Sequence, residues 1–168
     1  MEFGDYVARQ RPALMRFATI LTGRTWLAED LVSDVLGRAF ERWDRIAPMA
    51  EPNAYVRRMI VNEYLSWHRR LARTSPSADV ELDTVPVSDG ADERAERDAM
   101  IQRLARLPRR QRAAVVLRYY AGLSDADIAD HLGCREVTVR SQISRALASL
   151  RLHPNTVTPV APALQEMR

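Results

Sequence analysis

Apolar residues near the start of the chain recur every three or four positions, which predicts helices rather than strands. A first helix is expected to end at Gly23, and a second is expected to run from near Trp26 to about Trp43. The residues predicted to face the core are Tyr6, Leu14, Phe17, Ala18 and Leu21 in the first helix and Leu31, Val35, Ala39 and Phe40 in the second.

A loop and a third helix follow. Pro48 and Pro52 interrupt regular structure, so residues 44–53 are predicted to form the loop. The third helix is expected to begin near Ala54 and to end with Arg69 and Arg70. Its apolar positions are Tyr55, Met59, Ile60, Tyr64 and Trp67.

Residues 99–153 show the same helical periodicity. One helix is marked by Met100, Ile101, Leu104 and Leu107. Pro108 suits the first turn of the next helix, which is expected to run to Gly122.

The last part of this stretch is patterned as a helix-turn-helix. A short first helix has an apolar stripe of Ile128, Ala129 and Leu132, and Gly133 tolerates the positive φ that a sharp turn needs. The second helix is expected to bury Val139, Ile143, Ala146, Leu147 and Leu150. Arg140, Ser141, Ser144 and Arg145 fall off that stripe and are predicted to face outward. A helix that is apolar behind and basic in front suits the DNA major groove.

The segment between the two helical stretches differs in composition. Residues 75–98 contain eight acids, two arginines, and several Pro, Ser and Gly residues, which predicts an extended, solvated linker. Residues 154–168 contain three prolines and are expected to form a loose tail. The sequence therefore predicts an all-α fold of two small domains, at residues 1–74 and 99–153, which we expect to fold independently.

Composition narrows the function classes. The 168 residues include a single cysteine, Cys134, which excludes an internal disulfide and favours a reducing, cytoplasmic compartment. No signal peptide, membrane-spanning stretch, metal-ligand spacing, nucleotide-binding loop or catalytic triad is found in the sequence. We therefore expect a cytoplasmic protein that is not an enzyme, contacts no membrane, and uses no cofactor or metal.

Positive charge is concentrated where the helix-turn-helix lies. Residues 99–153 contain ten arginines against four acids, and the chain has no lysine. Phosphate contacts need such an excess, because release of counterions supplies much of the affinity for DNA. A helical unit that binds nothing is the less favoured interpretation of the same spacing.

A second basic group lies on the predicted third helix. Its arginines are Arg57, Arg58, Arg69, Arg70 and Arg73, with Tyr64 and Trp67 among them. Cations for the backbone and flat rings for unstacked bases are what melted DNA requires. Taken alone, the pattern fits equally well a solvated basic face whose aromatic residues turn into the core.

The order of these motifs resembles a bacterial RNA polymerase sigma factor of the extracytoplasmic-function (ECF) group, in its actinobacterial form. The resemblance covers about residues 3–152. It is carried by residues 28–32 (AEDLV), which resemble region 2.2, by residues 54–70, which resemble regions 2.3 and 2.4, and by residues 107–112, 117–120 and 138–141, which resemble region 4.

The resemblance implies partners and site residues. It implies a protein that binds core RNA polymerase, recognises the minus-10 and minus-35 elements of promoter DNA, and helps to open the duplex. Binding to the β′ clamp helices is implied for Asp30, Asp34 and Arg38, while region 4 would contact the β flap. Minus-10 recognition is implied for Asn62, which would read a flipped base, and for Arg57, Arg58, Trp67, Arg69 and Arg70. Minus-35 recognition is implied for Arg135, Thr138, Arg140, Ser141 and Arg145. An anti-sigma factor is a further possible partner.

Three positions depart from the family pattern. Ser33 stands where the family usually has Gln, and Val137 stands where it often has Gly. Arg135 replaces a Ser at the start of the recognition helix, so a helix-capping acceptor is lost there. The promoter sequence therefore does not follow from the resemblance.

Two other function classes remain open on sequence alone. A stand-alone dimeric helix-turn-helix regulator would bind duplex DNA without polymerase, but it leaves the basic and aromatic third helix unused. A protein-interaction module would bind no DNA at all.

Overall fold

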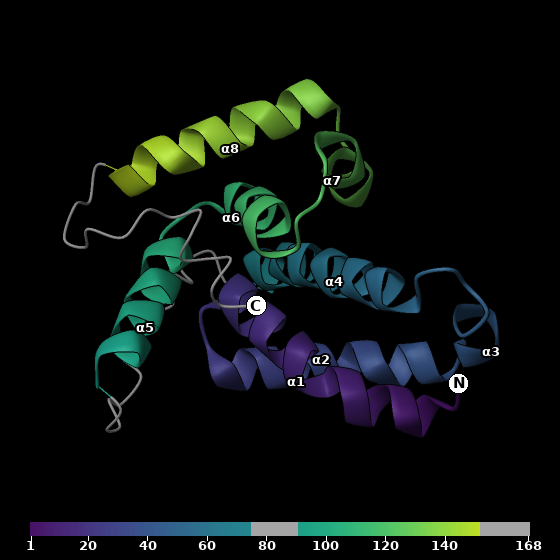
Figure 1. Cartoon of the computed structure of the whole chain (residues 1–168). Coiled ribbons are helices and arrows are strands. Elements are labelled where there is room, and N and C mark those ends of the chain that lie inside the picture. Colours follow the sequence, from purple (N-terminus) through teal and green to yellow (C-terminus); the bar gives the residue numbers. More distant parts are fainter. Residues whose placement is uncertain (75–90, 152–168) are drawn as a thin grey trace.

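The computed structural model describes residues 1–74 and 91–151, with side chains described for residues 1–66 and 95–151. Every regular element in these ranges is helical (Figure 1), which confirms the predicted all-α class. The elements are α1 (Phe3–Thr22), α2 (Thr25–Phe40), α3 (Trp43–Ile46), α4 (Pro52–Thr74), α5 (Ala91–Ala105), α6 (Arg109–Val115), a π-helical turn η1 (Val116–Tyr120), α7 (Asp125–Leu132) and α8 (Glu136–Arg151). The predicted tail, residues 154–168, and linker residues 75–90 lie outside the described residues.

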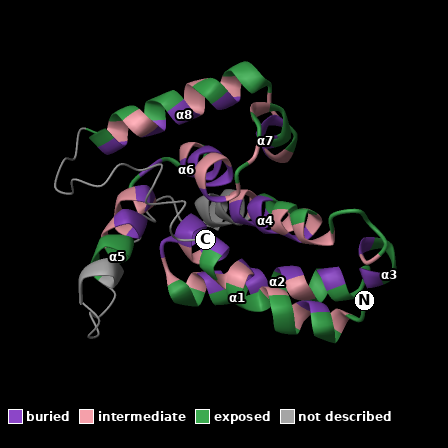
Figure 2. Ribbon diagram, in the orientation of Figure 1, coloured by how far each residue is buried: buried purple, intermediate pink, exposed green. Residues whose placement is uncertain are grey.

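Residues 1–74, here the N-terminal unit, form a helical layer in which α2 packs against both α1 and α4. The predicted apolar faces meet in its core, where Leu14, Phe17, Val35 and Ile60 are fully buried (Figure 2). Gly23 ends α1 as predicted. Its φ of 77° is left-handed, and its N–H donates to the carbonyl of Thr19.

The boundaries in this unit differ from the prediction in two places. The second helix ends at Phe40 rather than near Trp43, and a short helix, α3, overlaps the start of the segment predicted as a loop. Pro52 opens α4 two residues early, because proline fits the first helical turn, where its missing N–H costs nothing. Phe40 was predicted to face the core, yet 64% of it is exposed. It lies at the end of α2, where its ring contacts only the rim of the core, 5.1 Å from the ring of Phe3.

Residues 91–151, here the C-terminal unit, are built around α6 and η1. All of Arg112–Leu117 is buried, so this segment forms the centre of the unit, with α7 and α8 packed against it. The backbone N–H of Ala121 donates to the carbonyl of Val116, five residues back, which is the π-helical pattern. The predicted continuous helix to Gly122 is therefore an α-helix followed by a π turn.

Helix α5 begins earlier than predicted. It starts at Ala91, so residues 91–98 are helical although they were assigned to an extended linker. The segment is rich in Ala, Glu and Arg, which are strong helix formers, and acids favour the first turn of a helix. High net charge was the misleading signal, because it is compatible with an exposed helix as well as with an extended chain.

The two units pack against each other, an arrangement that the prediction of independent folding did not anticipate. The rings of Phe17 in α1 and Tyr120 in η1 stack with centroids 5.9 Å apart. Gly23 lies so close to α5 that a Cβ on it would approach the Cβ of Ala105 to 2.9 Å. The buried residues of both units thus form one hydrophobic cluster.

No helix among the residues described is both long enough and apolar enough to cross a lipid bilayer.

Candidate nucleic-acid and polymerase interfaces

The helix-turn-helix predicted from sequence is present as α7 and α8. Ser124 caps α7, because its Oγ accepts the N–H of Asp127 at 3.1 Å while the Asp127 carboxylate accepts the N–H of Ser124 at 3.3 Å. The hydrogen bonds from Ser124 to that carboxylate hold the pKa of Asp127 below its usual range. Gly133 ends α7 with a φ of 60°, as the sharp turn requires.

The outer face of α8 carries the predicted minus-35 residues. Arg135, Arg140 and Arg145 are exposed, and Thr138 and Ser141 are partly buried. The predicted inner face is buried at Val139, Ile143, Ala146 and Leu150, while Leu147 is partly buried. The carbonyl of Arg135 accepts the N–H groups of Thr138 and Val139, so Arg135 occupies the cap position although its side chain is not a capping acceptor. Val137, in the first turn, is 56% exposed.

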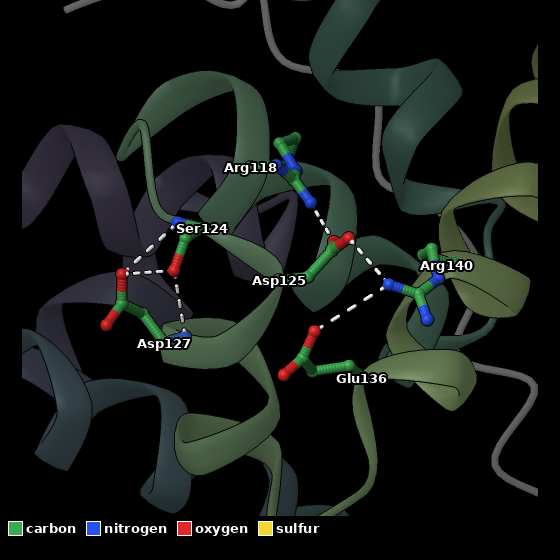
Figure 3. Close-up of polar contacts among 6 residues, drawn as sticks. All are labelled: Arg118, Ser124, Asp125, Asp127, Glu136 and Arg140. Atoms are coloured by element: carbon green, nitrogen blue, oxygen red, sulfur yellow. Dashed lines mark hydrogen bonds and ion pairs between the residues drawn. The ribbon is translucent and has the colours of Figure 1, made fainter.

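The guanidinium of Arg140 is not isolated on this face. Its Nη1 lies 3.5 Å from the carboxylate of Asp125 and 3.7 Å from that of Glu136 (Figure 3). Arg118 of η1 forms an ion pair with the same Asp125 carboxylate. Sequence reasoning missed Asp125 and Arg118. Only the Glu136–Arg140 pair has the four-residue helical spacing that a sequence reveals.

Helix α4 carries the predicted minus-10 residues. Asn62 and Arg58 are exposed, whereas Arg57 is partly buried with its guanidinium 5.8 Å from the ring centroid of Phe17. Trp67, Arg69 and Arg70 lie on the α4 backbone, but their side chains are outside the described set. The structure therefore brings Arg58 and Asn62 to one surface and turns Arg57 partly toward the core.

Asn62 and Arg58 line a cleft of about 630 Å³ between α4 and the C-terminal unit. Across this cleft, Arg58 Nη2 donates to the carbonyl of Asp130 at 3.0 Å, and Arg109 and His131 are also among the lining residues. The predicted minus-10 face thus looks toward α7 in this arrangement.

Two arginines of α6 hold the N-terminal and C-terminal units together beside the cleft. Arg109 Nη1 donates to the carbonyl of Tyr64 at 2.9 Å, and its guanidinium lies 5.0 Å from the Tyr64 ring centroid. Arg112 is only 7% exposed and donates to the carbonyls of Leu21, Ala105 and Leu107. Burial lowers the pKa of both arginines and raises that of Tyr64, whose increase the two cations oppose. Sequence reasoning did not identify this pair as a junction.

The predicted polymerase-binding residues lie on α2. Asp30 and Asp34 are both exposed on this helix. Arg38 is also exposed, but its Nη2 lies 2.8 Å from the carboxylate of Glu63 in α4, and its Nε donates to the carbonyl of Asp34. Arg38 thus also joins α2 to α4, and it is only partly available to another protein.

Comparison with known families agrees with this architecture. Residues 6–74 match the family model described as Sigma-70 region 2, and residues 97–150 match the one described as Sigma-70, region 4. The first match covers the N-terminal unit, and the second covers most of the C-terminal unit.

Individual relatives extend over most of the chain. The RNA polymerase sigma-E factor of Streptomyces avermitilis is 36% identical over 152 residues, which cover 90% of this chain and 84% of the relative. The ECF RNA polymerase sigma factor SigL of Mycobacterium tuberculosis is 34% identical over 146 residues, which cover 83% and 81%.

Solved structures show the same fold. The sigma factor RpoE of Bartonella quintana, in complex with the anti-sigma factor NepR, has a TM-score of 0.73 and 28% identity, with 92% of this chain and 98% of that chain covered. CnrH, in complex with the cytosolic domain of CnrY, has a TM-score of 0.59 and 22% identity over 92% of this chain and 89% of that chain, a likeness of fold alone. With both characteristic regions matched in order and relatives aligned over most of their length, the chain belongs to the ECF group of RNA polymerase sigma factors.

Proposed function

We propose that this protein binds core RNA polymerase, recognises the minus-10 and minus-35 elements of a promoter, and initiates transcription there. The observation that carries the proposal is the placement of exposed polar and basic side chains on one helix in each sigma region. Asn62 and Arg58 lie on α4 in region 2, and Arg135, Arg140 and Arg145 lie on α8 in region 4. The proposed action is binding and trapping of flipped bases, with no covalent step performed by this chain.

Run-off transcription tests this function. Purified chain and core polymerase are combined on a library of genomic promoter fragments, and a defined set of transcripts is expected only when both are present. Core polymerase alone is the control. Absence of chain-dependent transcripts would contradict the proposal.

Capture of core polymerase separates this function from the alternative of a stand-alone dimeric regulator. The immobilised chain is expected to retain core polymerase in the absence of DNA through α2, where Asp30 and Asp34 are exposed. The β′ clamp helices are the proposed contact of α2, and the β flap that of region 4. A stand-alone regulator would bind duplex DNA but retain no polymerase. Because the proposed partners are polymerase and promoter DNA, the cytoplasm is the proposed compartment.

An anti-sigma factor is a further proposed partner. The sigma factor RpoE of Bartonella quintana, 28% identical to this chain, was solved in complex with the anti-sigma factor NepR. In this chain, the cleft between α4 and α7 places the minus-10 face opposite region 4. A protein that stabilised this arrangement would compete with promoter binding. Co-purification from the native host, followed by loss of run-off transcription when the captured protein is added, tests this assignment.

Asn62→Ala is expected to impair promoter opening more than polymerase binding. The side-chain amide is exposed and offers both donors and an acceptor for one base edge. Loss of a base contact costs about 1–3 kcal/mol, which corresponds to roughly 5- to 150-fold in occupancy of the open complex. Permanganate footprinting measures opening, and core-polymerase capture is the parallel control. A normal bubble with this variant would contradict the assignment.

Arg145→Ala is expected to weaken binding to all minus-35 sequences about equally. Arg140 and Arg145 are five positions apart, so they point about 140° apart around α8, and Arg145 lies farther from the helix end that approaches base edges. Loss of one phosphate contact reduces the slope of log affinity against log salt by about one unit. The holoenzyme is titrated onto matched and mismatched duplexes over a salt series. An unchanged slope would remove Arg145 from the interface.

A further inference from the structure

The carboxylate of Asp125 joins three elements of region 4. It forms one ion pair with Arg118 of η1 and a second with Arg140 of α8 (Figure 3). Asp125 is itself the first residue of α7. Asp125 and Arg118 are largely shielded, with side chains 22% and 30% exposed, whereas Arg140 is 60% exposed. A carboxylate that is also paired with Arg118 therefore contacts one terminal nitrogen, Nη1, of an arginine whose side chain is mostly exposed.

The geometry of these contacts restricts how Arg140 can meet DNA. The carboxylates of Asp125 and Glu136 both lie near Nη1 of Arg140, at 3.5 and 3.7 Å. Contacts at Nη1 leave the fork formed by Nε and Nη2 for a further partner, because the guanidinium is planar and carries five donors. A two-pronged fork matches O6 and N7 of guanine, the commonest specific arginine contact in the major groove.

The local charges favour a base over a phosphate. Two carboxylates beside one guanidinium reduce the positive potential that would attract the DNA backbone, so Arg140 is a poorer phosphate ligand than an isolated arginine. The ion pairs of Arg140 are exposed on the arginine side, and such pairs contribute little to folding stability. Holding a flexible side chain in one direction reduces the entropy lost when it binds a base.

We propose that Asp125 is a positioning residue that, supported by Arg118, directs Arg140 to a guanine of the minus-35 element. The inference rests on the proposed function and deepens it. Asp125 lies in the first helix of the helix-turn-helix. It would thereby affect discrimination at one base pair without touching DNA itself.

The test replaces single acceptors in the DNA. Each guanine of a promoter found by run-off transcription is replaced in turn by 7-deazaguanine, which lacks the N7 acceptor, and holoenzyme affinity for each duplex is measured. Wild type is expected to lose about tenfold at one guanine of the minus-35 element. Asp125→Asn and Arg140→Ala are expected to bind the unmodified duplex about tenfold more weakly and to show no further penalty at that guanine.

Asp130→Asn is the matched control. It makes the same change of charge on α7, but the contact of Asp130 with Arg58 is made by its backbone carbonyl. It should retain the tenfold penalty. Far-UV circular dichroism checks folding. If Asp125→Asn does not fold, Arg118→Gln serves instead, because it removes the cation paired with the Asp125 carboxylate. It should reduce the penalty at that guanine, and an undiminished penalty overturns the inference.

Each outcome decides the matter. A penalty that persists in Asp125→Asn, or a wild-type holoenzyme indifferent to every 7-deazaguanine, overturns the inference while leaving the proposed function intact. A wild-type chain that supports no promoter binding with core polymerase overturns the proposed function itself.

Discussion

Individual arginines perform different tasks in this chain, although composition presents them as one class. Arg145 is exposed on the recognition helix, Arg38 bridges two helices through Glu63, and Arg112 is buried among backbone carbonyls. Burial of a guanidinium is costly unless its donors are paired, so Arg112 is tolerated because three carbonyls accept from it. What an arginine does here depends on its acceptors rather than on its charge.

Arg112→Leu is expected to lower the free energy of unfolding by about 3 kcal/mol, because the carbonyls of Leu21, Ala105 and Leu107 lose a shared buried donor. Urea unfolding followed by circular dichroism measures the change. Arg110→Leu is the matched control, since Arg110 lies two residues earlier on α6 with its side chain exposed, and it should change stability by less than about 0.5 kcal/mol. Equal losses in the two variants would show that the Arg112 contacts contribute no net stability.

At the scale of elements, α7 is a short helix that begins at a side-chain cap and ends at a left-handed glycine. Eight residues are too few for a stable isolated helix, so the cap at Ser124, the left-handed Gly133 and packing against α8 together hold it. The position of α7 matters because Asp125 at its start contacts the recognition helix. A short helix can thus determine the orientation of a binding residue on its neighbour.

Ser124→Ala is expected to lower the free energy of unfolding by about 1 kcal/mol through loss of the helix cap. It also alters the pH dependence. Hydrogen bonds from Ser124 depress the pKa of folded Asp127 below its usual value of 3.8, so their stabilisation is present above pH 3.8 and is lost as the pH falls below it.

In Ser124→Ala the pKa of Asp127 should therefore rise toward 3.8, and the loss of stability below that pH should shrink. NMR titration of the Asp127 carboxyl and unfolding at several pH values measure both effects. Ser144→Ala, at an exposed position in the middle of α8, is the control and should change neither. An unshifted Asp127 in Ser124→Ala would exclude the cap as the cause.

At the scale of the whole molecule, the contact between the two sigma regions is the main feature. Phe17 stacks on Tyr120, Arg109 covers Tyr64, and Gly23 allows α5 to approach α1. Together these contacts set the minus-10 face of α4 against α7 across the cleft. A residue at this junction can therefore affect stability and the relation between the two DNA-binding surfaces together.

Gly23→Ala tests how closely the regions approach. A left-handed φ costs alanine about 1–2 kcal/mol, and the new Cβ would also meet the Cβ of Ala105 at 2.9 Å. Gly133→Ala shares the left-handed strain but meets nothing within 4 Å, so it is expected to cost only that strain.

Unfolding free energies of a double-mutant cycle separate the two effects. Gly23→Ala should cost more in the wild-type chain than in the Ala105→Gly background, where the colliding methyl is absent. Equal costs in both backgrounds would mean that α5 does not lie against Gly23 in solution.

Patterns in the sequence were sufficient to predict the all-α class, the helix-turn-helix and the family. Periodic apolar positions and a glycine at a turn act over a few residues, so they can be recognised without knowledge of the fold. The same local signals located the inner face of α8 and the end of α1 at Gly23.

Which distant groups meet depends on how the helices pack in three dimensions. The pairing of Asp125 with Arg140, the hydrogen bond of Arg112 to the carbonyl of Leu21, and the packing of Phe17 on Tyr120 join residues 15 to 103 positions apart, a separation that leaves no periodic trace in the chain. The misassigned residues have the same cause. Phe40 is apolar but lies at a helix end beyond the core, and residues 91–98 are charged yet helical, because burial and helix formation depend on surroundings that composition does not contain.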